Sequence, residues 1–313
     1  MGSGRRSTRL RAAAAPTAPP ADPPPGGAHE FVRAPRTLGG MVASVTGYRS
    51  WGATPQLHRG LPSPYLTLIF SLDGPIVGGE TPEHVRAPDA YRSEIVLGGL
   101  HQRPAYIAQP SHEEGVQLAV HPLAARALLG VPAADLTLLA GDGADVLGAR
   151  ATEIRERLGE LPDWEERFAT LTTYLRQRAE DAGRRGEVRP EVAEAWRWMA
   201  WHRGAGSLDG MARHVALSRR QLTALFQREL GAGPKQVSRL MRFERAQRAI
   251  TGAVTANAVP DLSRIAAHCG YYDHSHLVRD FRQYTGLSPS GWIAEERRNI
   301  QAGGHRNGEE WDT

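Results

Sequence analysis

The stretch that decides the fold of this 313-residue chain is LSRIAAHCGYYDHSHLVRDFRQYTGLSP, residues 262–289. In its first part, Leu262, Ile265, Ala266 and Cys269 recur at the spacing of one helix face. Gly270 breaks this pattern where a sharp turn needs a residue that tolerates positive φ. Asp273 is suited to cap a second helix, whose polar outer face suits the DNA major groove. The stretch predicts a helix-turn-helix unit; an ordinary amphipathic helical hairpin is the alternative.

The outer face of the second helix is made of hydrogen-bond donors and cations. We predict DNA contacts for Asp273, His274, Ser275, His276, Arg279 and Arg282. His274 and His276 also form an HxH pattern, which can bind a metal ion when it lies on a β-strand. On a helix, residues two apart point about 200° apart, so this pair cannot converge on one ion.

Many fixed offsets in this stretch resemble the second helix-turn-helix of the AraC/XylS family of bacterial transcription regulators. The matching residues are Ile265-Ala266, Gly270-Tyr271, Asp273, Ser275-His276-Leu277, Arg279, Phe281-Arg282, Gly286 and Ser288-Pro289. The resemblance is specific over about residues 190–298 and loose over about residues 40–180. It implies a sequence-specific DNA-binding transcription regulator with an N-terminal sensor or dimerisation domain.

An internal repeat strengthens the helix-turn-helix interpretation. Residues of the stretch have counterparts 54 or 55 residues earlier, namely Leu208, Met211, Ala212, Leu222, Phe226, Gly231 and Pro234. The chain therefore contains two units, the second with one extra residue in its turn. Residues 235–251 form one long helix between them in this interpretation. Two reading helices about 34 Å apart on one face can enter successive major grooves, so a specific site does not require a dimer.

The first reading helix is expected to follow Ser218, a good N-cap residue. We predict DNA contacts for Ser218, Arg219, Arg220, Gln221, Thr223 and Ala224. Arginine can form two hydrogen bonds with guanine, and glutamine can do so with adenine. Arg239 and Arg242 on the connecting helix are candidates for phosphate contacts. Ala216 departs from the family pattern, where glycine is frequent; if the position needs positive φ, alanine costs on the order of 1 kcal/mol.

The basic charge of the chain lies in its C-terminal part. Residues 185–301 have a net charge of +7, whereas the rest of the chain has a net charge of −3. A phosphate-binding surface requires this distribution, so the expected partner is double-stranded DNA. The single cysteine, Cys269, excludes an internal disulfide and fits a reducing compartment. We expect a cytoplasmic, nucleoid-associated protein without membrane contact, and RNA polymerase as a further partner if the protein is an activator.

The N-terminal half shows short β-like runs separated by Gly and Pro. Expected strands cover residues 41–48, 65–70, 93–100, 105–108 and 116–121. Such strands form a small barrel or sandwich, and residues 67–75 resemble the cupin-like sensor half of the family. Helices are expected at residues 122–129, 149–158 and 164–182. In the family such helices often form a homodimer; packing on their own barrel is equally compatible with the sequence.

The expected fold class is α+β, with a β-rich cupin-like barrel plus helices followed by an all-α domain. The all-α domain contains the two helix-turn-helix units and their connecting helix. The expected divisions are a disordered tail at 1–29, a sensor or dimerisation domain at 30–183 (β-rich to about 121), an AraC-type DNA-binding domain at 187–301 and a flexible tail at 302–313.

The competing hypothesis is a cupin-type metal enzyme or ligand-binding protein that its C-terminal half tethers to DNA. The β-rich half contains histidines but no paired ligand spacing with a following Glu. Neither a phosphate-binding glycine loop nor a nucleophile constellation can be argued from spacing. We therefore predict no catalytic residue, metal or cofactor. A small effector would act through different affinities for active and inactive arrangements, and the sequence identifies none.

Overall fold

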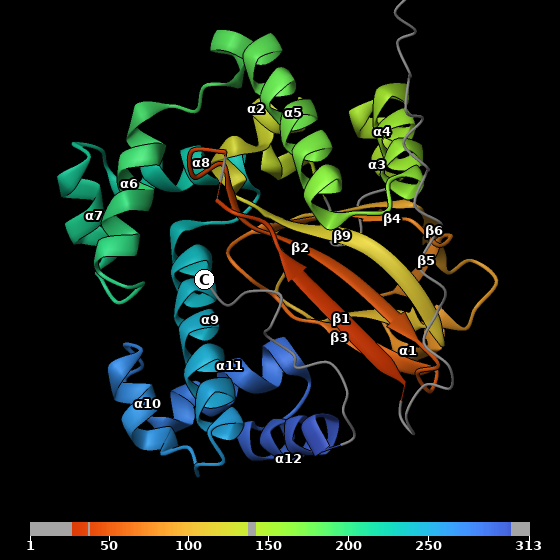
Figure 1. Cartoon of the computed structure of the whole chain (residues 1–313). Helices are drawn as coiled ribbons and strands as arrows, with labels where there is room; N and C mark the ends of the chain where they lie inside the picture. The colour runs from red at the N-terminus through yellow and green to blue at the C-terminus, as the bar shows by residue number, and fades with distance from the viewer. Residues whose placement is uncertain (1–26, 37, 137–141, 302–313) are drawn as a thin grey trace, which may run out of the picture.

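The computed structural model describes residues 27–36, 38–136 and 142–301. Its fold is α+β, as predicted: a β-rich half lies beside a helical C-terminal half (Figure 1). The tails expected at 1–29 and 302–313 lie outside the described residues, apart from residues 27–29. The first strand already begins at Ala28.

The strands of the described residues form two antiparallel sheets. The first sheet has the order β1-β2-β9-β4-β7, from Ala28–Arg33, Val42–Trp51, His112–Val120, Leu66–Ser71 and Ile95–Gly98. The second has the order β3-β8-β5-β6, from Gln56–Gly60, Ala105–Gln109, Ile76–Gly79 and Tyr91–Ser93. In the described chain neither sheet closes on itself, so the β-rich half is a two-sheet structure rather than a closed barrel.

All the described helices except α1, which lies between β5 and β6, follow the last strand. In the N-terminal half they are α1 Pro82–Val85, η1 Pro122–Ala124, α2 Ala125–Leu128, η2 Ala133–Asp135, α3 Gly143–Leu147, α4 Ala149–Glu160, α5 Trp164–Ala182 and η3 Gly183–Gly186. In the C-terminal half they are α6 Pro190–Trp201, α7 Leu208–His214, α8 Arg219–Leu230, α9 Pro234–Thr255, α10 Leu262–His268, α11 His274–Thr285 and α12 Pro289–Gln301. Among the described helices, none is both long and apolar enough to cross a bilayer.

Helix α5 packs against the sheet of its own chain. The side chain of Arg167 is buried and pairs with Glu114 of β9. Trp164 covers Gly47 of β2, where a Cβ atom would lie 2.4 Å from the indole ring. The guanidinium of Arg167 lies 4.6 Å from the same ring. Packing on the chain's own β-rich half is therefore present, and pairing with a second copy stays a prediction.

The hydrophobic core is continuous across the domain boundary that the sequence predicts between residues 183 and 187. One cluster runs from the sheets, for example Phe70, through Leu171 of α5 and Trp196 of α6 to Phe226 of α8. A separate cluster holds the C-terminal end of α9 together with α10, α11 and α12, around Phe281. The first helix-turn-helix unit thus shares its core with the β-rich half, whereas the second has a core of its own. The division into domains near residue 187 stays a prediction.

Candidate DNA-binding surface

The first helix-turn-helix unit consists of α7 and α8, joined by residues 215–218. The Ser218 hydroxyl accepts a hydrogen bond from the Gln221 amide nitrogen at 3.2 Å, and Gln221 Oε1 accepts one from the Ser218 amide at 2.9 Å. This capping box satisfies two backbone donors and fixes where α8 begins. Leu222 and Phe226 are fully buried on its inner face, as predicted.

The second unit consists of α10 and α11, joined by residues 269–273. Its turn has one residue more than the turn of the first unit, as the repeat predicts. Asp273 accepts a hydrogen bond from the His276 amide at 2.7 Å and caps α11. Leu277 and Phe281 are fully buried on its inner face. Both reading helices end at a glycine in the left-handed region, Gly231 and Gly286.

The turns of both units contain one residue in the left-handed region. Gly270 has φ 79° in the second unit, and Ala216 has φ 54° in the first. The position therefore does need positive φ, and the predicted cost of an alanine applies there. Gly270 is also tightly packed, since a Cβ atom on it would lie 2.5 Å from the Cβ of Ala205.

Most residues predicted to contact DNA are exposed. They are Ser218, Arg219, Arg220, Gln221, Ala224, Asp273, His274, Ser275, Arg279 and Arg282. Thr223 and His276 are half-buried, and the His276 ring lies edge-on to Tyr271 with 5.2 Å between centroids. His274 begins α11, so the HxH pair lies on a helix, as predicted.

The side chains predicted to contact DNA differ in whether they already form an ion pair or hydrogen bond within the protein. Arg219 pairs with Asp209 of α7, and the Gln221 amide belongs to the capping box. The guanidinium groups of Arg220, Arg279 and Arg282 make no hydrogen bond or ion pair with any described residue. These three arginines are therefore the side chains best placed to bind a new partner.

Arg239, predicted to contact phosphate, links α9 to the second reading helix. Its Nη2 donates to Asp280 Oδ1 at 2.7 Å and to Gln283 Oε1 at 2.8 Å. Its guanidinium lies 5.4 Å from the ring of Tyr284. Asp280 is only 1% exposed, so its carboxylate needs this partner. Burial raises the pKa of Tyr284 to about 12, so its hydroxyl stays neutral.

Arg242, the other predicted phosphate contact, links α9 to the loop before α7. Its Nη1 donates to the Gly204 carbonyl at 3.0 Å, and its guanidinium lies 5.6 Å from the ring of Tyr271. Sequence reasoning missed the internal roles of both arginines. For Arg239 the available signal was Asp280, a carboxylate on the inward stripe of α11 between Leu277 and Tyr284.

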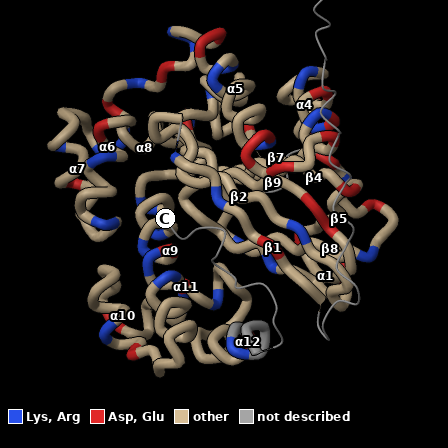
Figure 2. Tube along the Cα trace, viewed as in Figure 1, with Lys and Arg blue, Asp and Glu red and all other residues tan. Residues whose placement is uncertain are grey.

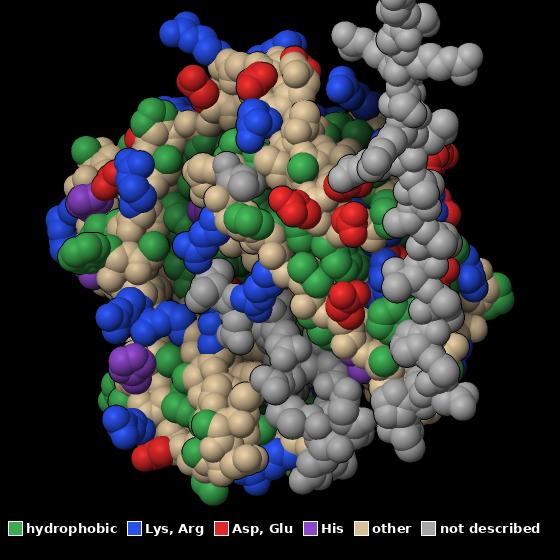
Figure 3. All heavy atoms as spheres, in the orientation of Figure 1, with side chains coloured by type: hydrophobic (Ala, Val, Ile, Leu, Met, Phe, Trp, Pro, Cys, Tyr) green, Lys and Arg blue, Asp and Glu red, His purple; other side chains and the backbone are tan. Residues whose placement is uncertain are grey.

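The basic residues are arranged around the connecting helix. Figure 2 shows that Lys and Arg recur along α9. Figure 3 shows basic side chains gathered on one side of the molecule, between the positions that α7 and α10 occupy in Figure 1. This arrangement suits a polyanionic partner.

A match to a known family of sequences falls in the same part of the chain. A family model described as a helix-turn-helix domain matches residues 211–295. The HTH-type transcriptional regulator ArgR of Pseudomonas aeruginosa is 28% identical over 172 residues, which is 54% of this chain and 46% of that protein. The match thus spans about half the length of this curated relative.

The chain is also similar to solved structures. ToxT from Vibrio cholerae O395 is 12% identical, with a TM-score of 0.45 over 80% of this chain and 96% of that chain. The DNA-binding domain of AdpA, in complex with a target DNA, is 24% identical, with a TM-score of 0.32 over 36% of this chain and 98% of that chain. Given the family-model match and the two capped units, the chain carries a helix-turn-helix domain in its C-terminal part.

Proposed function

We propose that the protein is a sequence-specific transcription regulator that reads two adjacent major-groove segments of double-stranded DNA. The observation that supports this most is the presence of two capped helix-turn-helix units joined by one 22-residue helix, α9. A continuous helix holds both reading helices at a fixed separation. One chain can therefore engage two successive grooves.

The exposed side chains divide into base and phosphate contacts. Arg220 of α8 and Arg279 of α11 each reach toward bases, and each can form two hydrogen bonds with guanine. Arg282 and the amide groups at the helix starts bind phosphate, which positions the domain without reading sequence. Arg239 and Arg242 contribute positive potential to the same surface while holding α9 in place.

The test is to map genomic DNA fragments bound by the full-length protein. We expect a shared motif with two conserved blocks about 10 base pairs apart, since successive major grooves have that spacing. An Arg220→Ala variant should lose preference in one block and Arg279→Ala in the other. Binding without any shared motif would contradict the proposal. A motif with only one block would mean that only one of the two helices contacts bases.

The protein has further partners besides DNA. A small effector bound by the β-rich half controls DNA affinity, and RNA polymerase is a partner if the protein activates transcription. Helices α4 and α5 are the surface on which a homodimer would form. The protein acts in the cytoplasm, where the DNA is, and has no enzyme activity.

No specific observation favours the competing cupin-type metal enzyme. Within the described ranges, no three His, Cys, Asp or Glu side chains come together as a metal site would need. Metal analysis of the purified protein separates the two hypotheses. Stoichiometric iron, manganese or zinc that survives chelation would support the enzyme.

A further inference from the structure

We propose that the pocket between the two β-sheets binds a small organic cation, an amine or guanidine attached to an apolar body. The role of this ligand as the effector rests on the proposed function, whereas its binding does not. The pocket is lined by strands of both sheets, including Tyr48 and Gln117 of the first sheet and His58 and Ile107 of the second.

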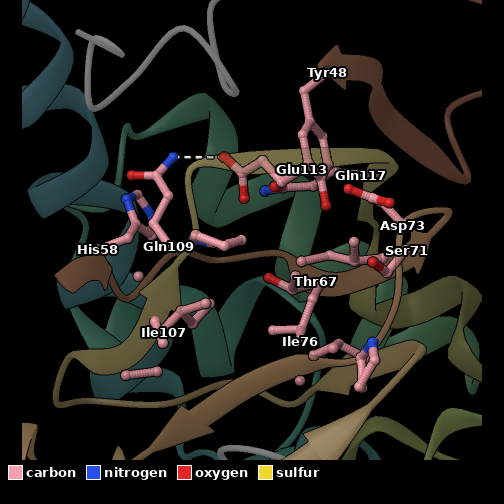
Figure 4. Close-up of a pocket in the computed structure, with 18 of the residues that line it drawn as sticks. Tyr48, His58, Thr67, Ser71, Asp73, Ile76, Ile107, Gln109, Glu113 and Gln117 are labelled. Carbon is pink, nitrogen blue, oxygen red and sulfur yellow. Dashed lines mark hydrogen bonds between the residues drawn. The ribbon is translucent and has the colours of Figure 1, made fainter. Parts of the chain in front are cut away.

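The walls of the pocket differ in polarity. Figure 4 shows Glu113, Gln117 and Tyr48 along one side, with Ile76 and Ile107 on the side facing them. Ile69 and Val96 add further apolar surface. An apolar wall facing a few fixed polar groups is the usual form of a small-molecule site, because the wall gives affinity and the polar groups give orientation.

The charged groups of the pocket have one sign. Asp73 and Glu113 contribute carboxylates, and none of the described lining residues is Lys or Arg. A bound cation would gain Coulomb energy from both carboxylates, and a bound anion would be repelled by them. The pocket therefore favours a cationic ligand over an anionic one.

Glu113 is held in position from within the protein. Its Oε1 accepts a hydrogen bond from Gln109 Nε2 at 2.6 Å, and Gln109 Oε1 accepts one from Gln56 Nε2 at 2.9 Å. Gln109 is itself buried. A carboxylate has about four acceptor positions, more than the one that Gln109 occupies.

His101, one of the histidines that line the pocket, does not offset this charge. Burial lowers the pKa of His101 below its ordinary value, so its ring is neutral at neutral pH. His101 Nδ1 also lies 2.6 Å from the Arg103 carbonyl oxygen, which fixes the ring. A metal cation is a poorer occupant, since no metal-holding group of three such side chains occurs in the described part of the chain.

The pocket wall also contacts the second helix-turn-helix unit. Leu61 lines the pocket and packs against the core of that unit. Gln283 of α11 approaches the Gln102 carbonyl oxygen, next to His101, at 3.5 Å. A ligand that reshapes this wall would change how the second reading helix is held, which gives the cation a route to DNA affinity.

The test is calorimetry on the full-length protein with three probes that share a phenyl ring: phenethylamine, 2-phenylethanol and 3-phenylpropionate. We expect the amine to bind about tenfold more tightly than the alcohol, and the carboxylate to bind most weakly. Glu113→Gln should weaken amine binding about tenfold and leave the alcohol unchanged. Asp73→Asn, in an exposed turn, is the second variant should Glu113→Gln fail to fold.

Glu156→Gln is the matched control, because it makes the same charge change on the exposed face of α4. It should leave amine binding as in the unmodified protein. The proposal is overturned if the carboxylate binds as tightly as the amine, if the amine does not bind at millimolar concentration, or if both pocket variants retain full amine affinity.

A separate measurement tests the regulatory role. DNA affinity is compared with and without the amine, using fragments from the genomic mapping. Amine binding without any change in DNA affinity would overturn the effector role and leave the cation site standing. A failure to find specific DNA would overturn the proposed function, and the calorimetry would still decide the ligand class.

Discussion

Arg59 of strand β3 donates from Nη1 to both carboxylate oxygens of Glu295 in helix α12, at 3.0 and 3.3 Å. The two side chains are 20% and 29% exposed, so solvent screens the pair only in part. Glu295 belongs to the last helix packed around the core of the second unit, while β3 also lines the pocket. The ion pair therefore links the second helix-turn-helix unit to the β-rich half.

Removing this pair should loosen the second unit selectively. A double-mutant cycle with Arg59→Ala and Glu295→Ala should give a coupling energy of about 0.5–1 kcal/mol, because the pair is partly shielded. Amide hydrogen exchange should accelerate in α11 and α12, and exchange in α8 should not change, since α8 shares its core with the β-rich half.

The exposed pair Arg157–Glu160 on α4 is the control for this cycle. Its coupling energy should be smaller, since both of its side chains are more than half exposed. Equal acceleration of exchange in α8 and α12 would show that the pair does not act on the second unit alone.

The turn residues Ala216 and Gly270 should respond to substitution in opposite directions. Ala216→Gly relieves the left-handed strain and should stabilise the protein by about 0.5–1 kcal/mol, after the entropy that glycine adds to the unfolded chain. Gly270→Ala should destabilise it by more than about 2 kcal/mol, because strain adds to the close approach to Ala205. Urea unfolding of both variants at one pH measures the two changes.

The second unit could be predicted in detail because its signals are local. A cap residue such as Asp273, a turn glycine and an apolar stripe each depend on neighbours within one or two helical turns. The repeat then placed the first unit. The family pattern raised the question of positive φ at Ala216, and the structure shows φ 54° there. Strands were also predicted at 41–48 and 65–70, where apolar residues are dense, and the structure has them at 42–51 and 66–71.

Long-range partners could not be predicted from the same patterns. Strands β3 and β5, with the sequences QLHRG and IVGG, are too short and too polar or glycine-rich to stand out. The shared core of α8 and the sheets depends on tertiary packing rather than on any local pattern. Arg239 is an example. Its positive charge suggested a contact with DNA phosphate, and only the fold shows that Asp280 lies beside it.

Arg239→Ala should destabilise the second unit. It leaves the Asp280 carboxylate buried without its cation, and the cost should be about 2 kcal/mol, reduced from a fully buried pair because Arg239 is 28% exposed. Chemical unfolding measures this cost. Arg282→Ala is the control, since its exposed side chain should change stability by less than about 0.5 kcal/mol. An unchanged stability, with a lower salt dependence of DNA binding, would instead assign Arg239 to phosphate.

Arg279→Ala should relax sequence preference at particular bases. A guanidinium that forms two hydrogen bonds with guanine contributes about 1–3 kcal/mol of discrimination, so the affinity loss should depend on the base present. Arg282→Ala should instead weaken binding to all sequences alike and lower the salt slope by about 1. Competition binding against single-base operator variants, at two salt concentrations, separates these outcomes. A uniform loss for Arg279→Ala would make it a phosphate contact.

Two groups with shifted pKa values, the buried Glu244 and the half-buried His121, should give the protein opposing pH dependences. Burial raises the pKa of Glu244 from 4.5 to about 7, against the opposing effect of Arg248. Its stabilising contribution is therefore complete below pH 4.5 and lost as the pH rises through 7. Burial lowers the pKa of His121 from 6.5 to about 4, so its contribution is complete above pH 6.5 and lost as the pH falls.

Because these contributions have opposite signs, they should largely cancel in the unmodified protein between pH 5 and 6.5. Glu244→Gln removes one of them, so stability should then rise with pH over this window, by up to about 2 kcal/mol. Urea unfolding at pH 5, 5.5, 6 and 6.5 measures how the free energy of unfolding changes with pH in the unmodified protein and in Glu244→Gln. Glu156→Gln should keep the unmodified profile. A Glu244→Gln profile parallel to that of the unmodified protein would mean that Arg248, 3.0 Å away, keeps the carboxylate ionised in the fold.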